Sequence, residues 1–212
     1  MDRFTDILFV VLGWLLGTLT PGVTEAIRRP KRRDEIFAAL RSEFVEIRYK
    51  LALVAHNMRA RTGTMSHGSL ALVRPIIMGY EGNSTDGALR ESVTKLLSQG
   101  EGAYIALHNT RKGQGSPYPV RYESPFLEAH LHDLGLLSPK VQETILRLRA
   151  EFHLFNEQVD QVRQAHDRSF TIADKTNHAL NNQNYEAGLE KLAYRAETVI
   201  REIDDLVGPA TT

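Results

Sequence analysis

The side chains best suited to hold a metal ion or move a proton in this chain are its eight histidines. The run His130-Leu-His132-Asp133 contains two of them next to an acid. In the helix that we expect there, side chains two residues apart point about 200° from each other, so these two histidines cannot share an ion. His153 and Glu157 lie four residues apart, where a surface ion pair is the expected contact. We therefore predict no metal site.

A basic segment with two glycines, Arg111-Lys-Gly-Gln-Gly-Ser-Pro117, is the closest approach to a nucleotide loop. It lacks the G-x-x-x-x-G-K-[ST] order and leads into prolines rather than into a helix that could hold phosphate. The segment belongs to a connection of about fifteen residues, and connections of that length often contact ligands or partners. Its cations and rings form our candidate ligand or partner loop: Arg111, Lys112, Tyr118, Arg121 and Tyr122. The alternative is a plain turn.

Other catalytic signatures are missing from the sequence. It contains no G-x-S-x-G elbow, no H-E-x-x-H motif and no cysteine, so neither a serine-hydrolase elbow, a zincin site nor a thiol nucleophile is indicated. The 26 basic residues balance 26 acidic ones, which argues against a general nucleic-acid-binding role. We assign no catalytic residue and no cofactor, and an enzyme remains an unsupported alternative.

The N-terminal segment, residues 1–27, reads as a membrane anchor. Ile7 to Thr24 are eighteen uncharged residues, which in a helix extend about 27 Å, near the thickness of a thin bilayer. The strongly apolar part, Ile7 to Leu19, is only thirteen residues long, so a surface or core helix and a cleaved signal are the alternatives. Asp2 and Asp6 do not suit the positive leader of a signal peptide. We predict a single membrane helix.

A basic collar, residues 28–33, follows this segment and sets the predicted orientation. Its five cations are Arg28, Arg29, Lys31, Arg32 and Arg33. Because lysine and arginine beside a span stay in the cytoplasm, we expect the N-terminus outside and the rest of the chain inside, at the inner membrane of a bacterium. The collar can also bind anionic lipid headgroups. The alternative is that it serves as a topology signal alone.

Two features inside the anchor bear on its packing and its end. Gly13 and Gly17 form G-x-x-x-G, a spacing that lets two membrane helices approach closely and favours self-association. Pro21-Gly22 is expected to end or kink the helix at the membrane interface, because proline lacks an amide donor and clashes with the preceding turn.

Three later stretches carry apolar residues at alternating spacings of three and four, the pattern of a long packed helix. The first stretch has no proline or glycine between Asp34 and Arg61, and the second opens at the helix-start signal Ser138-Pro139. The third ends before Gly208-Pro209. The three apolar seams are Phe37, Leu40, Phe44, Ile47, Leu51, Val54 and Met58; Val141, Ile145, Leu148, Phe152, Phe155, Val159 and Val162, with His166 in the next position as a core histidine; and Tyr185, Leu189, Leu192, Ala196, Val199, Ile203 and Leu206.

The fold that we predict is all-α: a single N-terminal membrane helix, then an antiparallel bundle of three to four long helices over residues 34–208. Neighbouring apolar residues such as Leu146 and Leu154 widen the seams beyond a two-stranded coiled coil. Residues 62–137 read as an insertion of short helices at 69–78, 86–98, 101–109 and 125–136. Between the last two long helices, Thr171-x-x-Asp174 suggests a short extra helix and Asn181-Asn-Gln-Asn184 a turn.

These features favour an interaction or scaffold protein: a helical bundle tethered at the cytoplasmic face, with membrane lipid and either a protein partner or further copies of itself as partners, and no nucleic acid. Part of a sensing or stress-response assembly is one such role. The first alternative is an oligomerising, membrane-active effector. The second is a helical ligand-binding protein or enzyme that uses the middle helices and the 111–123 loop.

Overall fold

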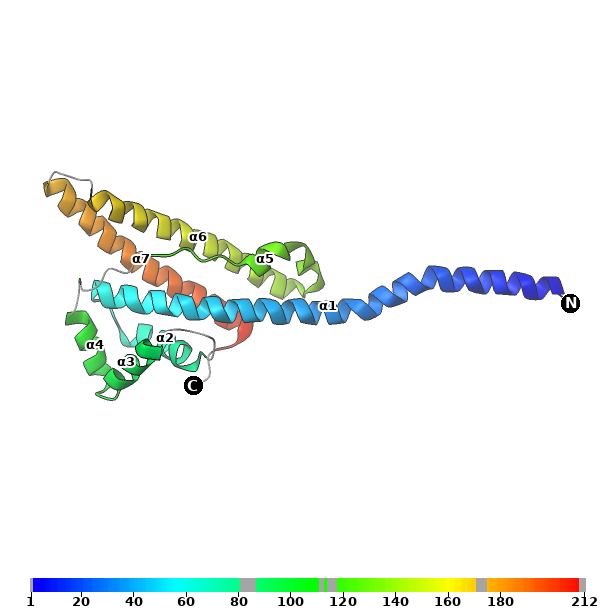
Figure 1. Ribbon diagram of the computed structural model, residues 1–212, viewed down its shortest axis with the longest axis horizontal. Coiled ribbons are helices and arrows are strands. Elements are labelled where there is room, and N and C mark those ends of the chain that lie inside the picture. Colours follow the sequence, from blue (N-terminus) through cyan, green and yellow to red (C-terminus); the bar gives the residue numbers. More distant parts are fainter. Residues whose placement is uncertain (1, 81–86, 111–112, 114–117, 171–174, 210–212) are drawn as a thin grey trace.

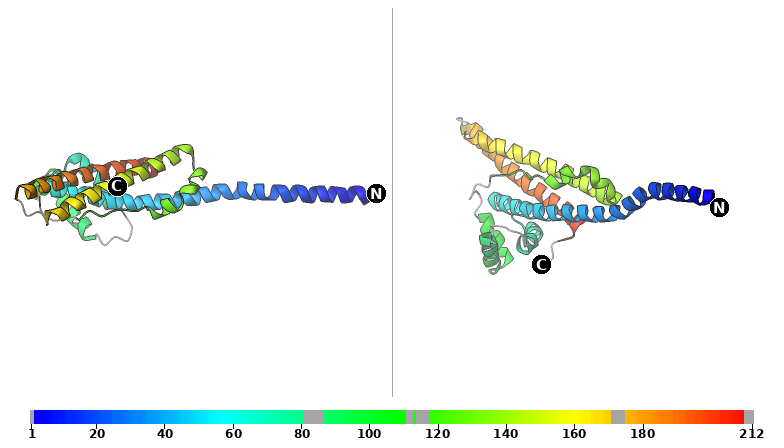
Figure 2. Two further views of the ribbon diagram at one scale, coloured as in Figure 1. Left: turned by 90° about the horizontal axis from the view of Figure 1, so that it is seen from above. Right: turned by 45° about the vertical axis from the view of Figure 1, so that its right-hand side comes forward.

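A computed structural model describes the backbone of residues 2–80, 87–110, 113, 118–170 and 175–209. Side chains are described over the same ranges except at 2–12, 15–16, 18–27, 87–89, 92, 96 and 175–176. The described backbone is helical with connecting turns and contains no strand, which confirms the all-α prediction. Figure 1 shows a bundle from which one long helix projects, and Figure 2 shows the same projection from two further directions.

The longest helix, α1, spans Asp2–Thr62 without interruption. Of the two outcomes predicted for Pro21-Gly22, an end or a kink, the end is therefore wrong. Figure 1 shows a change of direction in α1 between its N-terminal part and the bundle, and proline inside a helix is a known cause of such bends. The N-terminal part, residues 2–27, is called the stalk below. It runs through the collar directly into the first seam.

The other two long helices are α6, Pro139–Ser169, and α7, Lys175–Val207. Ser138 is the N-cap residue of α6 and Pro139 follows it, as predicted, although the serine side chain makes no capping hydrogen bond. The predicted seams form the core, and most of their members are less than 9% exposed. The half-buried exceptions are Phe37, Val141, His166 and Leu206.

Helix α7 begins ten residues before the predicted third seam, at Lys175 instead of Tyr185. The predicted turn Asn181-Asn-Gln-Asn184 is therefore wrong, because these residues lie inside the helix. Asn181 is buried, and its amide donates a 2.7 Å hydrogen bond to the Ala165 carbonyl of α6. The hydrogen bond satisfies the buried amide of Asn181, so this polar residue fits inside the packed helix and no turn is needed. The predicted short helix at 171–174 lies outside the described residues.

Helix α7 lies between α1 and α6 and packs against both. Figure 1 shows that α1 and α6 run in one direction and α7 in the other. A Cβ atom added at Gly188 of α7 would stand 2.9 Å from Cγ2 of Val162 in α6, so this glycine allows the close approach of the two helices. Leu146 and Leu154 of α6, expected to widen the seam, are 52% and 39% exposed instead. The apolar stripe of α6 is therefore narrow.

The return segment 118–137 runs back along the bundle and ends in a short helix, α5 (Pro125–Ala129), and a 3₁₀ helix, η1 (Leu131–Leu136). The single helix predicted at 125–136 is thus divided at His130. Glu43 of α1 accepts hydrogen bonds from the backbone amides of Phe126 and Leu127, at 2.8 and 3.1 Å. This carboxylate satisfies the free amides at the start of α5, so the segment is fixed to α1.

Three short helices, α2 (His67–Gly79), α3 (Gly87–Leu97) and α4 (Glu101–Thr110), form the insertion. Their bounds agree closely with the predicted ones, and Pro75 lies inside α2 as expected. Helices α2 and α4 pack against α1, and α3 packs against α4. Figure 1 shows the three helices on the side of α1 away from α6. The insertion therefore covers a flank of α1.

Leu192→Ala should lower the free energy of unfolding by about 2–5 kcal/mol, the range for removing a fully buried leucine side chain. Leu192 is 0% exposed at the centre of the α7 seam. Urea unfolding followed by circular dichroism measures the change. Leu146→Ala on the exposed face of α6 is the matched control, with an expected loss below about 1 kcal/mol. Equal losses at both positions would contradict the core assigned here.

Candidate functional site

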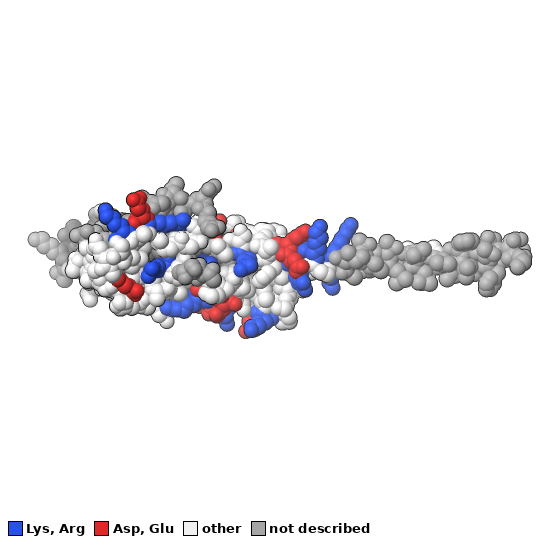
Figure 3. Space-filling model, turned by 90° about the horizontal axis from the view of Figure 1, so that it is seen from below, with Lys and Arg blue, Asp and Glu red and all other residues white. Residues whose placement is uncertain are grey.

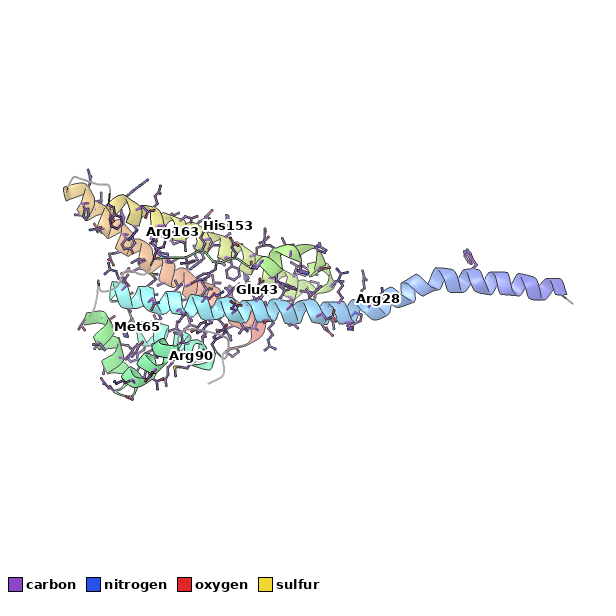
Figure 4. All side chains as sticks on the ribbon, in the orientation of Figure 1. Arg28, Glu43, Met65, Arg90, His153 and Arg163 are labelled. Atoms are coloured by element: carbon purple, nitrogen blue, oxygen red, sulfur yellow. The ribbon has the colours of Figure 1, made fainter. Side chains whose placement is uncertain are left out.

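The collar lies where the stalk meets the bundle. The described cations Arg28, Arg29, Lys31 and Arg33 are exposed, and Figure 3 shows lysine and arginine side chains gathered at this junction. Arg28, labelled in Figure 4, stands at the end of the collar nearest the stalk. The contacts of two of the cations are with acids of the same helix: Lys31 with Glu35 at 3.8 Å and Arg33 with Asp34 at 2.9 Å. These pairs are exposed and weak, so the collar remains a cationic surface.

Arg32 differs from the other collar residues because it reaches a distant acid. Its Nη2 atom donates a 2.6 Å hydrogen bond to Oδ1 of Asp133 in η1, and the Asp133 side chain is only 7% exposed. His132 Nε2 lies 3.3 Å from the other carboxylate oxygen. A buried carboxylate requires such partners. Sequence reasoning missed this pair, because 101 residues separate its members and no local pattern links them.

The five residues of the candidate loop have different outcomes in the structure. Arg111 and Lys112 lie outside the described residues. Tyr118 is 46% exposed and lies under the Arg163 guanidinium, whose carbon is 4.7 Å from the ring centroid. Arg121 Nη1 pairs with Asp160 of α6 at 3.1 Å.

Tyr122, by contrast, faces the core. Its backbone amide and carbonyl both bond to the Asn156 side chain, at 3.0 and 2.8 Å. Its ring stacks on Phe155 with a centroid distance of 6.0 Å, and burial raises the pKa of the Tyr122 hydroxyl. Tyr122 is therefore a packing residue. Of the five candidate residues of this loop, Tyr118 and Arg121 are described and exposed.

A groove of about 560 Å³ lies between residues 122–128 and α6. Its wall is amphipathic: the Phe152 ring and the Leu146 side chain lie near Arg149, which pairs bidentately with Glu128 at 2.8 and 3.1 Å. That pair lowers the pKa of Glu128, chiefly through the hydrogen bond from Arg149. His153, labelled in Figure 4, also lines the groove. The groove has room for a small ligand, but its Arg149 and Glu128 already neutralise each other.

The histidines singled out in the sequence do not meet at one point. His153 pairs with Glu157 at 3.2 Å on the exposed face of α6, as predicted. The His130 and His132 rings are 6.4 Å apart between centroids. His166 contacts the rings of Tyr118, Phe170 and Tyr185, which makes it a half-buried packing residue. Within the described ranges, no three histidine, aspartate or glutamate side chains come together as metal ligands would.

A buried polar cluster between α1 and α4 escaped the sequence analysis. His56 of α1 is 4% exposed, and its Nε2 atom lies 2.5 Å from the Tyr104 hydroxyl of α4. The ring of His108 is 4.4 Å from that of Tyr104 and 5.3 Å from that of His56. Burial lowers the pKa of His56 and raises the pKa of Tyr104 to about 12. The cluster holds the insertion on α1 through buried polar side chains.

The structure gives no support to the predicted membrane helix, and few side chains of that segment are described. Gly13 and Gly17 are exposed, and a Cβ atom at either would meet nothing within 4 Å. Trp14 is 70% exposed. Among the residues whose side chains are described, no helix has an apolar stretch long enough to cross a membrane. Most of the apolar run from Ile7 to Leu19 lies outside those residues.

Comparison with known proteins adds no family. No protein-family model matches the chain, and neither a curated protein nor a solved structure matches it.

The stability of the protein should fall as the pH drops below about 6.5, the ordinary pKa of histidine. The unfolded chain takes up a proton at His56 near that pH, whereas the folded pKa is lower. The unfolded state then binds more protons, so the contribution of this site is complete above pH 6.5 and is lost as the pH approaches the folded pKa. Urea unfolding at neutral and mildly acidic pH measures the loss. His56→Gln should reduce this pH dependence and His153→Gln on the surface should keep it; the same dependence in both variants would contradict the assignment.

Proposed function

We propose that this chain is a membrane-tethered helical-bundle protein that holds partners, or further copies of itself, at the cytoplasmic face of a bilayer. The stalk is the tether, the collar meets the lipid headgroups, and residues 34–208 form the cytoplasmic body. The N-terminus lies outside in this arrangement, because the five collar cations keep the following chain inside.

The observation that carries this proposal is the continuity of α1. One helix contains the apolar run, the collar and the first seam, and it ends at Thr62. The seam half is buried in the bundle, whereas the stalk projects from it (Figures 1 and 2). A projecting stretch of eighteen uncharged residues needs a partner in which apolar side chains are favourable. A bilayer followed by a cationic collar is the arrangement that suits both its length and its charge.

Self-association through Gly13 and Gly17 extends the proposal. Both glycines have open space beside their Cα atoms, so a second helix can approach there without displacing a side chain of this chain. Two helices that pair in lipid gain van der Waals contact where small residues meet. This would make the stalk both the tether and the contact between copies.

A second candidate, a ligand-binding bundle, is favoured by the groove between residues 122–128 and α6. Its volume of about 560 Å³ falls within the range of small-molecule sites. The groove is open, and the arginine that lines it, Arg149, is already paired with Glu128. For this reason we place the tethered interaction protein first.

Fluorescence of Trp14 tests the tether directly, because it is the only tryptophan of the chain. After reconstitution of the full chain into vesicles, its emission should shift to shorter wavelength and be quenched by lipids brominated on their acyl chains. The reason is that an inserted stalk places the indole among those chains. A control chain carries Trp14→Phe together with Leu146→Trp, which moves the single tryptophan to the exposed surface of α6. Quenching in the control, or its absence for Trp14, would contradict the tether.

The orientation can be tested with reporters at the two ends of the chain. A reporter fused after Thr212 should report the cytoplasm, and a tag before Met1 should be labelled from outside. Replacing Arg28, Arg29, Lys31 and Arg33 by glutamine should produce a mixed orientation or less insertion, because the flanking positive charge is removed. Arg32 is kept in this variant because it pairs with Asp133. A C-terminal reporter found outside would show that the proposed orientation is wrong.

A further inference from the structure

The 3₁₀ helix η1 is fixed beside the collar. The Arg32–Asp133 pair, at 2.6 Å, joins it to α1, and three turns further along α1, Glu43 binds the first amides of α5. Figure 4 labels Glu43 and Arg28 on the same helix. With both ends held, α5 and η1 lie along α1 in a set position. The stretch Leu131–Lys140, which comprises η1 and the first residues of α6, is called the shoulder below.

The shoulder stands at nearly the same height along α1 as the collar. Arg28 and Arg32 are four residues apart, which corresponds to about 6 Å along a helix. The headgroup layer of a bilayer is about 5–8 Å thick on each side, and the surface potential extends about 8–10 Å beyond it. If Arg28 lies among the headgroups, as the proposed tether requires, the shoulder lies within the field of the membrane surface.

The charges of the shoulder suit an anionic surface. Its exposed ionisable side chains are His132 and Lys140. Its single acid, Asp133, is buried and neutralised by Arg32. Exposed acids also lie near the shoulder: Glu128 is paired with Arg149, and Asp34 and Glu35 of α1 are paired with Arg33 and Lys31. Glu143 is three residues beyond Lys140, further into α6. The lysine of the shoulder therefore faces an approaching headgroup beside acids that already have cationic partners.

We propose that the shoulder forms a second contact with anionic lipid headgroups, on one side of α1 and beside the collar. This inference rests on the proposed tether. Lys140 and His132 supply the polar contact, and the half-buried side chains of Leu131 and Leu136 lie next to them. Because the shoulder is on one flank only, the contact draws the body toward the membrane on that flank and fixes its rotation about the stalk.

The test places a reporter on the shoulder. The chain has no cysteine, so Gly135→Cys creates a single labelling site, and a Cβ atom there meets nothing within 4 Å. Gly102→Cys in α4 is the matched control, because Gly102 is also exposed and open, on the insertion. A fluorophore at each position is read in full-length protein reconstituted with lipids that carry a quencher on the headgroup. Vesicles contain phosphatidylcholine alone or with phosphatidylglycerol added.

We expect strong quenching at position 135 in vesicles with phosphatidylglycerol, weak quenching in phosphatidylcholine alone, and little at position 102 in either. Lys140→Gln should lower the equilibrium constant for contact between the shoulder and the membrane, read at position 135, about fivefold. This is the effect of removing one cation near an anionic surface. Lys191→Gln, which removes an exposed cation of α7, should leave it unchanged. Circular dichroism confirms that each variant is folded.

The acyl-chain quenching of Trp14, measured on the same vesicles, separates the two hypotheses. If Trp14 is quenched and position 135 is not, the tether stands and the shoulder contact is wrong. Equal quenching at position 135 with and without phosphatidylglycerol, or no effect of Lys140→Gln, overturns the recognition of anionic headgroups. If Trp14 is not quenched, the tether fails and the shoulder contact fails with it.

Discussion

A helix in a small bundle usually buries one stripe of side chains along its length. The second half of α1 has to bury a wider part of its circumference. Residues 47–49, 51–52 and 54–56 are all buried, and at 100° per residue they cover an arc of about 220° around the helix axis. Helix α7 covers one side, whereas α2 and α4 cover another. The apolar surface of α1 therefore requires neighbours on both flanks, and the insertion exists as much to cover α1 as to carry any site of its own.

Polar contacts between α1 and α7 then select one alignment of the two helices. Arg48 pairs with Asp204 at 2.6 Å, and Arg59 holds Glu197 bidentately at 2.9 and 3.0 Å. The Glu197 side chain is only 5% exposed, and its hydrogen bonds raise the pKa of Arg59. Sliding α7 by one turn would leave these charges buried without partners, which costs several kcal/mol for each. Apolar seams alone would tolerate such a slip, so the ion pairs supply the alignment.

The heptad seams could be predicted because helix periodicity is a local property of the sequence. The start of α6 at Ser138-Pro139 and the bounds of α2 and α4 follow from equally local signals. What local reasoning missed depends on tertiary contacts. Pro21-Gly22 was compatible with an end or a kink, and the local signal could not decide between them; α1 continues, since a helix can bend at proline and go on. Asn181 was assigned to a turn because its bond to Ala165 of α6 could not be foreseen.

The candidate site also has features that the local sequence shows and features that only tertiary contacts reveal. The collar was visible as five cations within six positions, but the separate role of Arg32 became evident only when Asp133 was found beside it. Likewise, Tyr118 and Tyr122 looked equivalent in the sequence, and only the packing of Tyr122 on Phe155 distinguishes them. His56 gave no signal, since its partner Tyr104 is 48 residues away.

The unbroken path of α1 through the collar bears on how a tethered body would behave. A flexible linker would let the bundle turn freely above the membrane, with its faces exposed equally to partners. A helix transmits tilt and rotation, so the orientation of the stalk in the bilayer would also set that of the body. Arg32 would add to this coupling, because it stands among the collar cations while it neutralises Asp133. Under the proposed tether, the surfaces that face partners are then determined by the same few residues that anchor the protein.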